Sequence, residues 1–267
     1  MGPPAVAALL DAWEEGLLSP AIERTLGLLA AGCPALSRDQ LADLSIGRYD
    51  GALLRLREQT FGSRLVARTD CPVCGEALEL EFAVSDVLVD ADDQLEPEVA
   101  TTPTIVISHE GYELELRLPS NRDLIHLRDH PDGDARRTLF QRCLRGIRRL
   151  GSDTGEAAVG DSLPALGPGS VPESVLDSVL DVAAEQMATA DPQAHTRLAL
   201  ACAACSHRWQ EGFDIGGFFW VEVDAWARRV LDEIHSLASA YGWSEAEILS
   251  LSPVRRQYYL ELAVGHE

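Results

Sequence analysis

Two pairs of cysteines, each with the spacing Cys-x-x-Cys, constrain the fold of this chain more than any other feature. The first pair lies in Cys71-Pro-Val-Cys74-Gly75, and the second pair is Cys202 and Cys205. Both pairs contain or precede small and turn-forming residues, and strand-like sequence leads into and out of each pair. Two hairpin tips of this kind converge in a zinc ribbon, where four thiolates hold one tetrahedral Zn²⁺. The sequence therefore predicts one structural zinc ion bound by Cys71, Cys74, Cys202 and Cys205.

The separation of the two pairs is unusual for such a ribbon. Cys202 lies 128 positions after Cys74, whereas a simple ribbon has about 15–20 residues there. The ribbon must then be split, with residues 83–194 inserted between its two hairpins. We therefore expect an α+β chain, in which helical N- and C-terminal parts surround a split Cys₄ zinc ribbon that carries a large α/β insertion.

Other uses of the cysteines fit the sequence less well. A Cys-x-x-Cys redox centre would open a helix near a βαβ pattern, whereas both pairs follow strands; disulfides and chance spacing are further alternatives. A catalytic zinc needs an open coordination position, and four thiolates close the shell even though His207 lies two residues beyond Cys205. We place His207 beside the site or on the surface. Cys33 and Cys143 stand alone among apolar residues, which predicts small buried side chains.

Periodicity and turn residues divide the chain into a helical start, a split ribbon and a helical end. We assign residues 1–64 to an N-terminal helical region, residues 65–217 to the ribbon with its insertion, and residues 218–267 to a C-terminal helical region. The cysteine turns are 71–74 and 202–205, and residues 151–170, rich in Gly, Pro, Ser and acids, predict a flexible linker inside the insertion.

Secondary structure follows from the same patterns. Helices are predicted over the following residues: 4–31 in two pieces, 49–61, a helix opened by Ser120 and Asp123, 134–150, 171–187, 224–240, a helix opened by Ser244 and Glu247, and 254–264. Strand patterns occupy residues 65–82, residues 103–118 as a hairpin, and residues 196–215.

The charge excludes whole classes of partner. The chain has 43 acidic and 22 basic side chains, a net charge of −21, and would repel nucleic acid or an anionic membrane surface. Much of the acid lies in the insertion, since residues 81–100 hold seven acidic side chains and residues 151–195 hold eight, with no basic one in either stretch.

No stretch reaches the ~20 apolar residues of a spanning helix, and the start lacks the features of a secretory signal. We expect a cytoplasmic protein that binds neither nucleic acid nor membrane.

The one local concentration of positive charge lies in residues 134–150. Its six arginines are Arg136, Arg137, Arg142, Arg145, Arg148 and Arg149. We interpret them as a solvated face that pairs with nearby carboxylates, with a docking surface for an acidic partner as the alternative. Nucleic acid fits poorly because Phe140 is the one aromatic residue available there for stacking.

The sequence offers no catalytic motif but does offer an interface composition. It contains no Gly-rich phosphate loop, no His-Glu-x-x-His and no Gly-x-Ser-x-Gly, so we assign no catalytic residue and no small-molecule substrate.

Eight of the sixteen aromatic residues fall within residues 218–259. Aromatic residues beside arginines are typical of protein interfaces. The predicted partner-binding residues are Trp243, Arg255, Arg256, Tyr258 and Tyr259.

Several pieces of the chain together form a pattern found in a known family. These pieces are Leu44–Asp50, Leu53–Arg57, Phe61-Gly62, Cys71–Gly75, Glu233–Ala238, Tyr241–Trp243, Glu247–Leu249 and Arg255–Leu260. They resemble the zinc-ribbon proteins encoded in the tail and baseplate gene clusters of contractile phages and of related contractile injection systems. Members are described as T-even-type baseplate hub assembly proteins or chaperones. The middle of the chain, roughly residues 83–194, resembles no family.

This resemblance implies a non-enzymatic role in the baseplate hub region. The chain would be an assembly factor or a minor structural component that contacts hub, spike or other tail proteins. It would act in the cytoplasm of the producing bacterial cell, with association with the particle left open. Two alternatives stay open: a zinc-ribbon adaptor or regulator of the transcription machinery, and an enzyme such as a thiol oxidoreductase or a zinc hydrolase.

Overall fold

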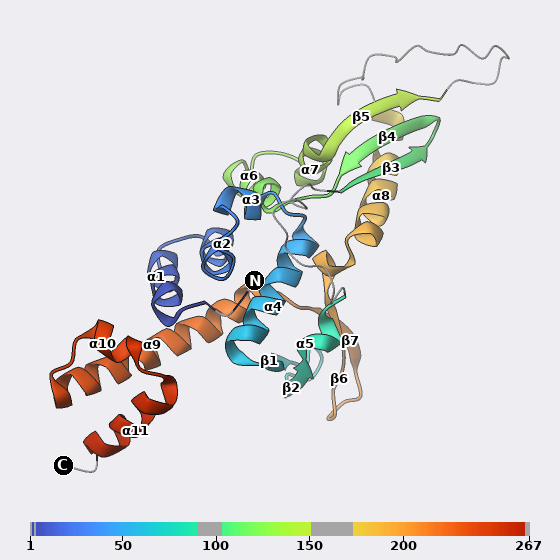
Figure 1. Cartoon of the computed structure of the whole chain (residues 1–267). Coiled ribbons are helices and arrows are strands. Elements are labelled where there is room, and N and C mark those ends of the chain that lie inside the picture. The colour runs from blue at the N-terminus through green and yellow to red at the C-terminus, as the bar shows by residue number, and fades with distance from the viewer. Residues whose placement is uncertain (1, 3, 90–102, 151–172, 265–267) are drawn as a thin grey trace. The chain divides into compact units, whose positions relative to one another are not determined.

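The computed structural model describes residues 2, 4–89, 103–150 and 173–264 (Figure 1). The chain divides into two compact units. The first unit joins Met1–Pro34 to Asp214–Glu267, and the second is Ala35–Phe213. Helices and small antiparallel sheets occur together, which confirms the predicted α+β class. The predicted linker, residues 151–170, lies outside the described residues. No helix in the described ranges is long and apolar enough to span a membrane.

The first unit is helical throughout its described residues. Its helices are α1 (Val6–Gly16), α2 (Ala21–Gly32), α9 (Ile215–Tyr241), α10 (Glu245–Ser250) and α11 (Pro253–Val264). Its core gathers around the buried face of α9, where Val230, Ile234 and Leu237 pack with Leu10 and Ile248. This arrangement confirms the two helical pieces at the start of the chain and the helices at its end.

Helix α9 is longer than the sequence indicated, and the prediction of a strand reaching residue 215 was wrong. The last ribbon strand ends at Gly212, and α9 begins at Ile215 rather than at residue 224. The Asp214 side chain accepts a hydrogen bond from the Gly217 N–H (3.0 Å) and caps the helix. Phe219 and Val223 are fully buried at helical spacing, so packing overrides the low helix propensity of the glycines.

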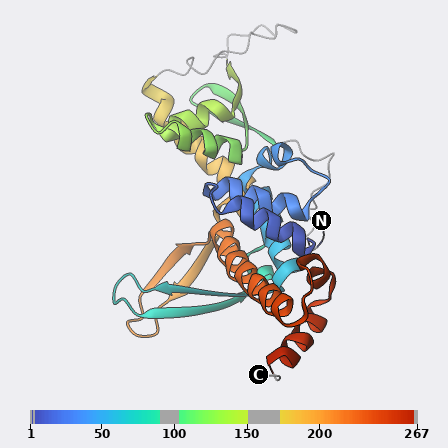
Figure 2. The same ribbon diagram turned by 90° about the vertical axis from the view of Figure 1, so that its left-hand side faces the viewer.

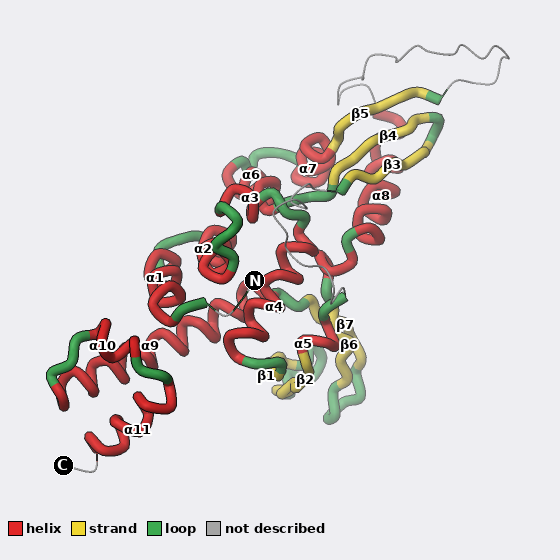
Figure 3. Tube along the Cα trace, viewed as in Figure 1, coloured by secondary structure: helices red, strands yellow, loops and turns green. Residues whose placement is uncertain are grey.

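The second unit contains the ribbon hairpins and everything between them. Its elements are α3 (Arg38–Ala42), α4 (Ile46–Phe61), β1 (Arg64–Asp70), β2 (Ala77–Ala83), α5 (Val84–Val87), β3 (Thr104–His109), β4 (Tyr112–Arg117), α6 (Asn121–Asp129), α7 (Ala135–Cys143), β5 (Leu144–Arg149), α8 (Glu173–Ala190), the 3-10 helix η3 (Pro192–His195), β6 (Arg197–Ala201) and β7 (Arg208–Gly212). The strands, yellow in Figure 3, form two antiparallel hairpins, β1-β2 and β6-β7, and one sheet of order β3-β4-β5.

The insertion has a core of its own, built from its three-stranded sheet, α7 and α8. Fully buried Leu114 and Leu116 of β4 pack with Ile147 of β5, Phe140 of α7 and Val179 of α8. The hairpin predicted at residues 103–118 is therefore confirmed as β3 and β4.

The prediction of one helix over residues 134–150 was wrong in its second half. The helix α7 ends at Cys143, and Leu144–Arg149 form β5, which pairs with β4. Ile147 lies opposite Leu114 in this register and is buried, so cross-strand packing overrides the local helix propensity of the Arg-rich sequence. Of the six arginines, four pair with carboxylates: Arg136 with Asp181, Arg137 with Asp134, Arg142 with Asp123, and Arg148 with Glu113. The pairs of Arg136, Arg137 and Arg148 are partly exposed and support the interpretation of a solvated face, whereas Arg142 pairs with a fully buried carboxylate.

A buried ion cluster fixes the junction between the sheet and the helices of the insertion. The fully buried Asp123 carboxylate accepts hydrogen bonds from the Arg117 guanidinium (2.6 and 2.7 Å) and from Arg142 Nε (2.7 Å). It also accepts one from the Ser120 N–H (3.0 Å) at the start of α6. Burial raises the pKa of Asp123, but the hydrogen bonds from Arg117 and Ser120 lower it more, to about 2.

The insertion attaches to the first turn of α4 at two places. Between β4 and α6, the Ile46 N–H donates to the Pro119 carbonyl (3.0 Å). On the exit side, the buried Asp191 carboxylate accepts from the Gly47 N–H (2.9 Å), which places a negative charge at the positive end of the helix. A Cβ at residue 47 would lie 2.7 Å from Asp191 Cγ and 2.8 Å from the Ala194 nitrogen, so this contact requires glycine.

We predict that Asp123→Asn destabilises the chain in a pH-dependent way. At neutral pH the substitution leaves Arg117 without its carboxylate, and the free energy of unfolding should fall by about 3 kcal/mol. Because the folded-state pKa is lowered from 3.8 to about 2, the stabilisation by the charge is present above pH 4 and is lost as the pH falls toward 2. It amounts to about 2 kcal/mol. Urea unfolding at a series of pH values measures both effects.

The matched control is Asp129→Asn, which removes an exposed carboxylate paired with the adjacent Arg128. It should change the free energy of unfolding by less than about 0.5 kcal/mol. Equal effects of the two substitutions would contradict the importance assigned to the buried cluster.

We also predict opposite effects for two glycines of α4. Gly47→Ala should lower the free energy of unfolding by about 1–3 kcal/mol because the added methyl group overlaps Asp191. Gly51→Ala meets nothing closer than 3.4 Å, the end of the flexible Arg55 side chain. It should be neutral or stabilise the helix by up to about 1 kcal/mol. Thermal unfolding of the two variants measures the difference, and a tolerated Gly47→Ala would contradict the contact.

Candidate metal centre

Four thiol groups from the tips of two hairpins meet at one point in the second unit. Cys71 and Cys74 lie in the turn between β1 and β2, and Cys202 and Cys205 lie in the turn between β6 and β7. All four Sγ atoms lie within 4.8 Å of one another. Figure 2 shows the two hairpins, one teal and one tan, beside each other. The structure thus brings together all four residues that the sequence analysis selected as metal ligands.

The backbone of the first turn is closed around the Cys71 side chain. The Cys71 N–H donates to the Glu76 carbonyl (2.8 Å), and the Gly75 N–H donates to the Cys71 carbonyl (2.9 Å). Gly75 has a φ of 73°, a left-handed conformation that costs glycine little. The turn therefore depends on the glycine that directly follows the cysteine pair.

The second turn repeats this pattern. The Cys202 N–H donates to the His207 carbonyl (2.9 Å), and the Ser206 N–H donates to the Cys202 carbonyl (2.9 Å). Ser206, at the position equivalent to Gly75, has a φ of 60°, which is uncommon for a residue with a side chain. Two unrelated stretches of sequence thus adopt one turn geometry, each presenting two thiols on the same side.

The distances between the sulfur atoms fit a metal ion and exclude disulfides. Cys71 Sγ lies 3.6 Å from Cys205 Sγ, and Cys74 Sγ lies 3.6 Å from Cys202 Sγ, whereas a disulfide bond is about 2.05 Å long. A tetrahedral Zn²⁺ with Zn–S bonds of about 2.3 Å would separate its ligand sulfurs by roughly 3.8 Å. Four thiols at this spacing can therefore close a tetrahedral shell around one ion.

The surroundings of the thiols also favour a cation. Burial raises the pKa of Cys71, but hydrogen bonds from the backbone N–H groups of Cys74 and Val73 lower it more, to about 7. For Cys74, the backbone N–H of Glu76 lowers the pKa, but the thiols around it, Cys205 first among them, raise it to about 12. Without a cation the cluster resists full ionisation, because thiolates so close together repel one another. A bound metal ion would ionise all four and release their protons, so metal affinity should rise with pH.

Other candidate ligands do not join the cluster. Among the described residues, the four cysteines form the one group of three or more metal-binding side chains. The His207 ring stacks on Trp209 at 5.7 Å. Cys33 and Cys143 are buried, as predicted, and burial raises the pKa of both thiols, that of Cys143 to about 11.

The predicted partner-binding residues separate into an aromatic cluster and an exposed group, both in the first unit. Trp243 lies 5.0 Å from Tyr259 and stacks on Tyr241 at 4.7 Å. The Tyr241 hydroxyl donates to the Tyr259 carbonyl (3.1 Å). Trp243 and Tyr259 pack against the core of this unit, so much of their surface serves the fold.

The two arginines of this group have different surroundings. Arg256 is 4% exposed, and its guanidinium donates to Glu233 (3.3 Å) and to the Leu251 carbonyl (3.1 Å). Arg255 is exposed, as is Tyr258 at 61%. Sequence reasoning missed two neighbours of Tyr258 on α11, Val254 (79% exposed) and Leu262 (40%). Their spacing of four residues on either side of Tyr258 could have identified them as one helix face.

We predict that Cys71→Ser removes the metal and unfolds the ribbon. The binding free energy of a structural metal ion, about 10 kcal/mol or more, is folding free energy in such sites. The variant should lose stoichiometric metal, measured by elemental analysis, and melt at a much lower temperature. Cys33→Ala is the matched control, because it removes a buried cysteine outside the cluster and should keep the metal. A Cys71→Ser/Cys202→Ser double variant with unchanged thermal stability would falsify the structural role.

Comparison with known protein families gives a match that covers most of the chain. The family model described as "T4 bacteriophage base plate protein" matches residues 21–220, about three quarters of the chain. The match includes both cysteine pairs and the middle, residues 83–194, for which the sequence analysis found no resemblance. The similar pieces between residues 233 and 260 lie outside it. No curated protein and no solved structure matches the chain. Since the match covers well over half of the sequence, the chain belongs to the family of T4 bacteriophage base plate proteins.

Proposed function

We propose that this baseplate protein is a non-enzymatic, zinc-stabilised assembly factor or minor structural component of the hub region of a contractile tail or injection system. The observation that carries the proposal is the family match, which extends over both halves of the four-thiol cluster. The protein would act through contacts with hub, spike or other tail proteins in the cytoplasm of the producing cell, or as part of the particle.

Zinc is the ion that the four thiols suit best. Tetrahedral sites made of four thiolates are typical of structural zinc, and a closed shell leaves no position for a water or a substrate. The ion would cross-link two hairpins whose sequences are far apart, and would do no chemistry. Neither an enzyme nor an adaptor of the transcription machinery is favoured by a specific observation.

An exposed face of α11 is the best candidate for contact with another tail protein. Val254, Tyr258 and Leu262 lie at intervals of four residues and are 79%, 61% and 40% exposed. Exposed Arg255 lies next to this face in the sequence. Tyrosine and arginine are among the residues that contribute most to binding energy at protein interfaces.

We predict that Tyr258→Ala combined with Arg255→Ala weakens incorporation or assembly without unfolding the chain. Both side chains are exposed, so the melting temperature should change by no more than a few degrees, whereas recovery of tail proteins with the tagged chain should fall by about tenfold. Affinity purification from the producing cell followed by mass spectrometry measures that recovery. Leu18→Ala, at a 98% exposed position in the same unit, is the matched control.

The wild-type chain must recover baseplate proteins for the proposal to stand. Recovery of RNA polymerase subunits in place of tail proteins would support the adaptor alternative and contradict the proposal. Mass spectrometry of purified particles then distinguishes a component, which is present, from an assembly factor, which is absent.

A further inference from the structure

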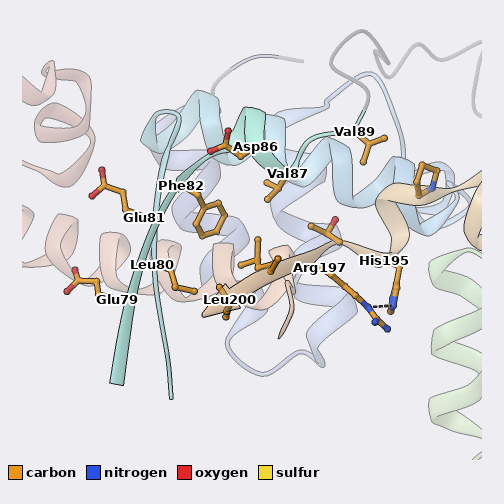
Figure 4. A pocket seen from close by; sticks show the side chains of 14 residues that line it. Glu79, Leu80, Glu81, Phe82, Asp86, Val87, Val89, His195, Arg197 and Leu200 are labelled. Atoms are coloured by element: carbon orange, nitrogen blue, oxygen red, sulfur yellow. Dashed lines mark hydrogen bonds between the residues drawn. The ribbon is translucent and has the colours of Figure 1, made fainter. Parts of the chain in front are cut away.

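A groove of about 680 Å³ runs between the two ribbon hairpins, inside the second unit (Figure 4). Residues 79–82 of β2 line one side and residues 197–200 of β6 line the other. No residue of β1 or β7 lines it, so the groove follows the sides of β2 and β6 that face away from their hairpin partners.

The edge of β2 in this groove has backbone groups available for another strand. The hydrogen bonds from Cys71 N–H to the Glu76 carbonyl and from Val84 N–H to the Ser63 carbonyl fix which residues of β2 bond to β1. In an antiparallel ladder, residue pairs that exchange backbone hydrogen bonds alternate with pairs that do not. The even-numbered residues 78, 80 and 82 therefore form backbone hydrogen bonds with β1. The N–H and carbonyl groups of Ala77, Glu79 and Glu81 therefore point away from it.

The edge of β6 also has backbone groups available for another strand. The hydrogen bonds from Cys202 N–H to the His207 carbonyl and from Phe213 N–H to the Thr196 carbonyl show that the backbone N–H and carbonyl groups of Leu198 and Leu200 point toward β7. The backbone groups of residues 197, 199 and 201 then point outward. In the described part of the chain each hairpin is a sheet of two strands, so neither edge is covered by a further strand.

The side chains of the groove alternate between an apolar face and an acidic face. Leu80 and Phe82 point toward Leu200 of β6, whereas Glu79 and Glu81 point to the opposite side of β2 (Figure 4). An added strand would therefore place every second residue against leucine and phenylalanine, and the others beside two carboxylates.

Strand β1 shows which residues suit the acidic face. On that side of β2, Arg64 donates to both oxygens of Glu81 (2.7 Å each), and Arg68 lies 3.9 Å from Glu79. The two carboxylates remain 60% and 64% exposed, so they can accept a second basic neighbour from the groove side. Small Ala199 on β6 leaves room for a long basic side chain.

Contacts at several places fix the walls of the groove relative to each other. The four thiols join the hairpins at their tips, and Phe82 meets Phe213 edge-to-face at 5.4 Å. At the far end, buried Gln193 donates to the Val87 carbonyl (3.1 Å) and accepts from the Val89 N–H (2.7 Å). A preformed groove of this kind lowers the entropic cost of binding.

From these observations we propose that the groove binds an extended segment of a partner protein, in which apolar and basic residues alternate, as an added strand on the edge of β2. The main-chain hydrogen bonds would supply affinity, and the alternation of leucine and glutamate along β2 would select the sequence. The identity of the partner as another baseplate protein rests on the proposed function; the binding chemistry does not.

The test uses the zinc-loaded full-length chain and a fluorescein-labelled peptide of about ten alternating valines and arginines, long enough to span β2. Fluorescence anisotropy should show saturable binding. Because the chain carries a charge of −21, any arginine-rich peptide binds to some extent. A peptide of the same composition, with its valines and arginines in two blocks, measures that background, and it should bind at least about tenfold more weakly.

Two proline variants then test the edge. Glu81→Pro removes an N–H that points into the groove, and should weaken binding of the alternating peptide by about tenfold or more. Val66→Pro removes an outward N–H from the opposite edge of the same hairpin, where Val66 lies directly across from Glu81, and should leave binding within about twofold. Neither proline breaks the β1-β2 ladder, and unchanged zinc content and melting temperature confirm that both variants fold.

A charge variant separates the acidic face from the edge. Glu79→Gln combined with Glu81→Gln should weaken binding several-fold and reduce its dependence on salt. Equal binding of the alternating and block peptides, or equal loss in the two proline variants, would overturn the proposal. Self-association of the free chain that Glu81→Pro abolishes would also overturn it, since a second copy would then occupy the groove. None of these outcomes depends on whether the chain recovers tail proteins.

Discussion

The contact on which the second unit depends is the meeting of four thiols from two hairpins 128 positions apart. Each hairpin alone is a two-stranded sheet, which is at best marginally stable in water. Closing so long a loop costs conformational entropy, and a metal ion bound by the four thiolates would supply enough free energy to offset it. The backbone turns around Cys71 and Cys202 support this by presenting their thiols in the same geometry.

The insertion is compatible with the ribbon because it leaves and returns at one place. At its entry, the Val87 carbonyl and the Val89 N–H form hydrogen bonds with the side chain of Gln193 at its exit. Pro119 and Asp191 also attach the insertion to the first turn of α4, through Ile46 and Gly47. Its own core and the buried Asp123 cluster stabilise it independently of the thiols. The two hairpins can then meet as though nothing lay between them, and the groove between β2 and β6 remains open to a partner.

Sequence reasoning found what local patterns encode. Cysteine spacing selected the ligand set, and capping residues such as Ser244 located helix starts. It missed what depends on distant contacts: β5 is a strand because Ile147 packs across from Leu114, and α9 starts early because Phe219 is buried. The requirement for glycine at residue 47 depends on Asp191, and no local pattern in the sequence could have revealed it.

Native mass spectrometry of the purified full-length chain, before and after treatment with a chelator, tests the structural metal most directly. We expect one zinc ion per chain, held by four deprotonated thiols. Its removal should be accompanied by a shift to higher charge states and by loss of the cooperative unfolding transition of the ribbon. A chain that carries no metal, titrates as six free thiols and keeps its unfolding transition in chelator would contradict the account.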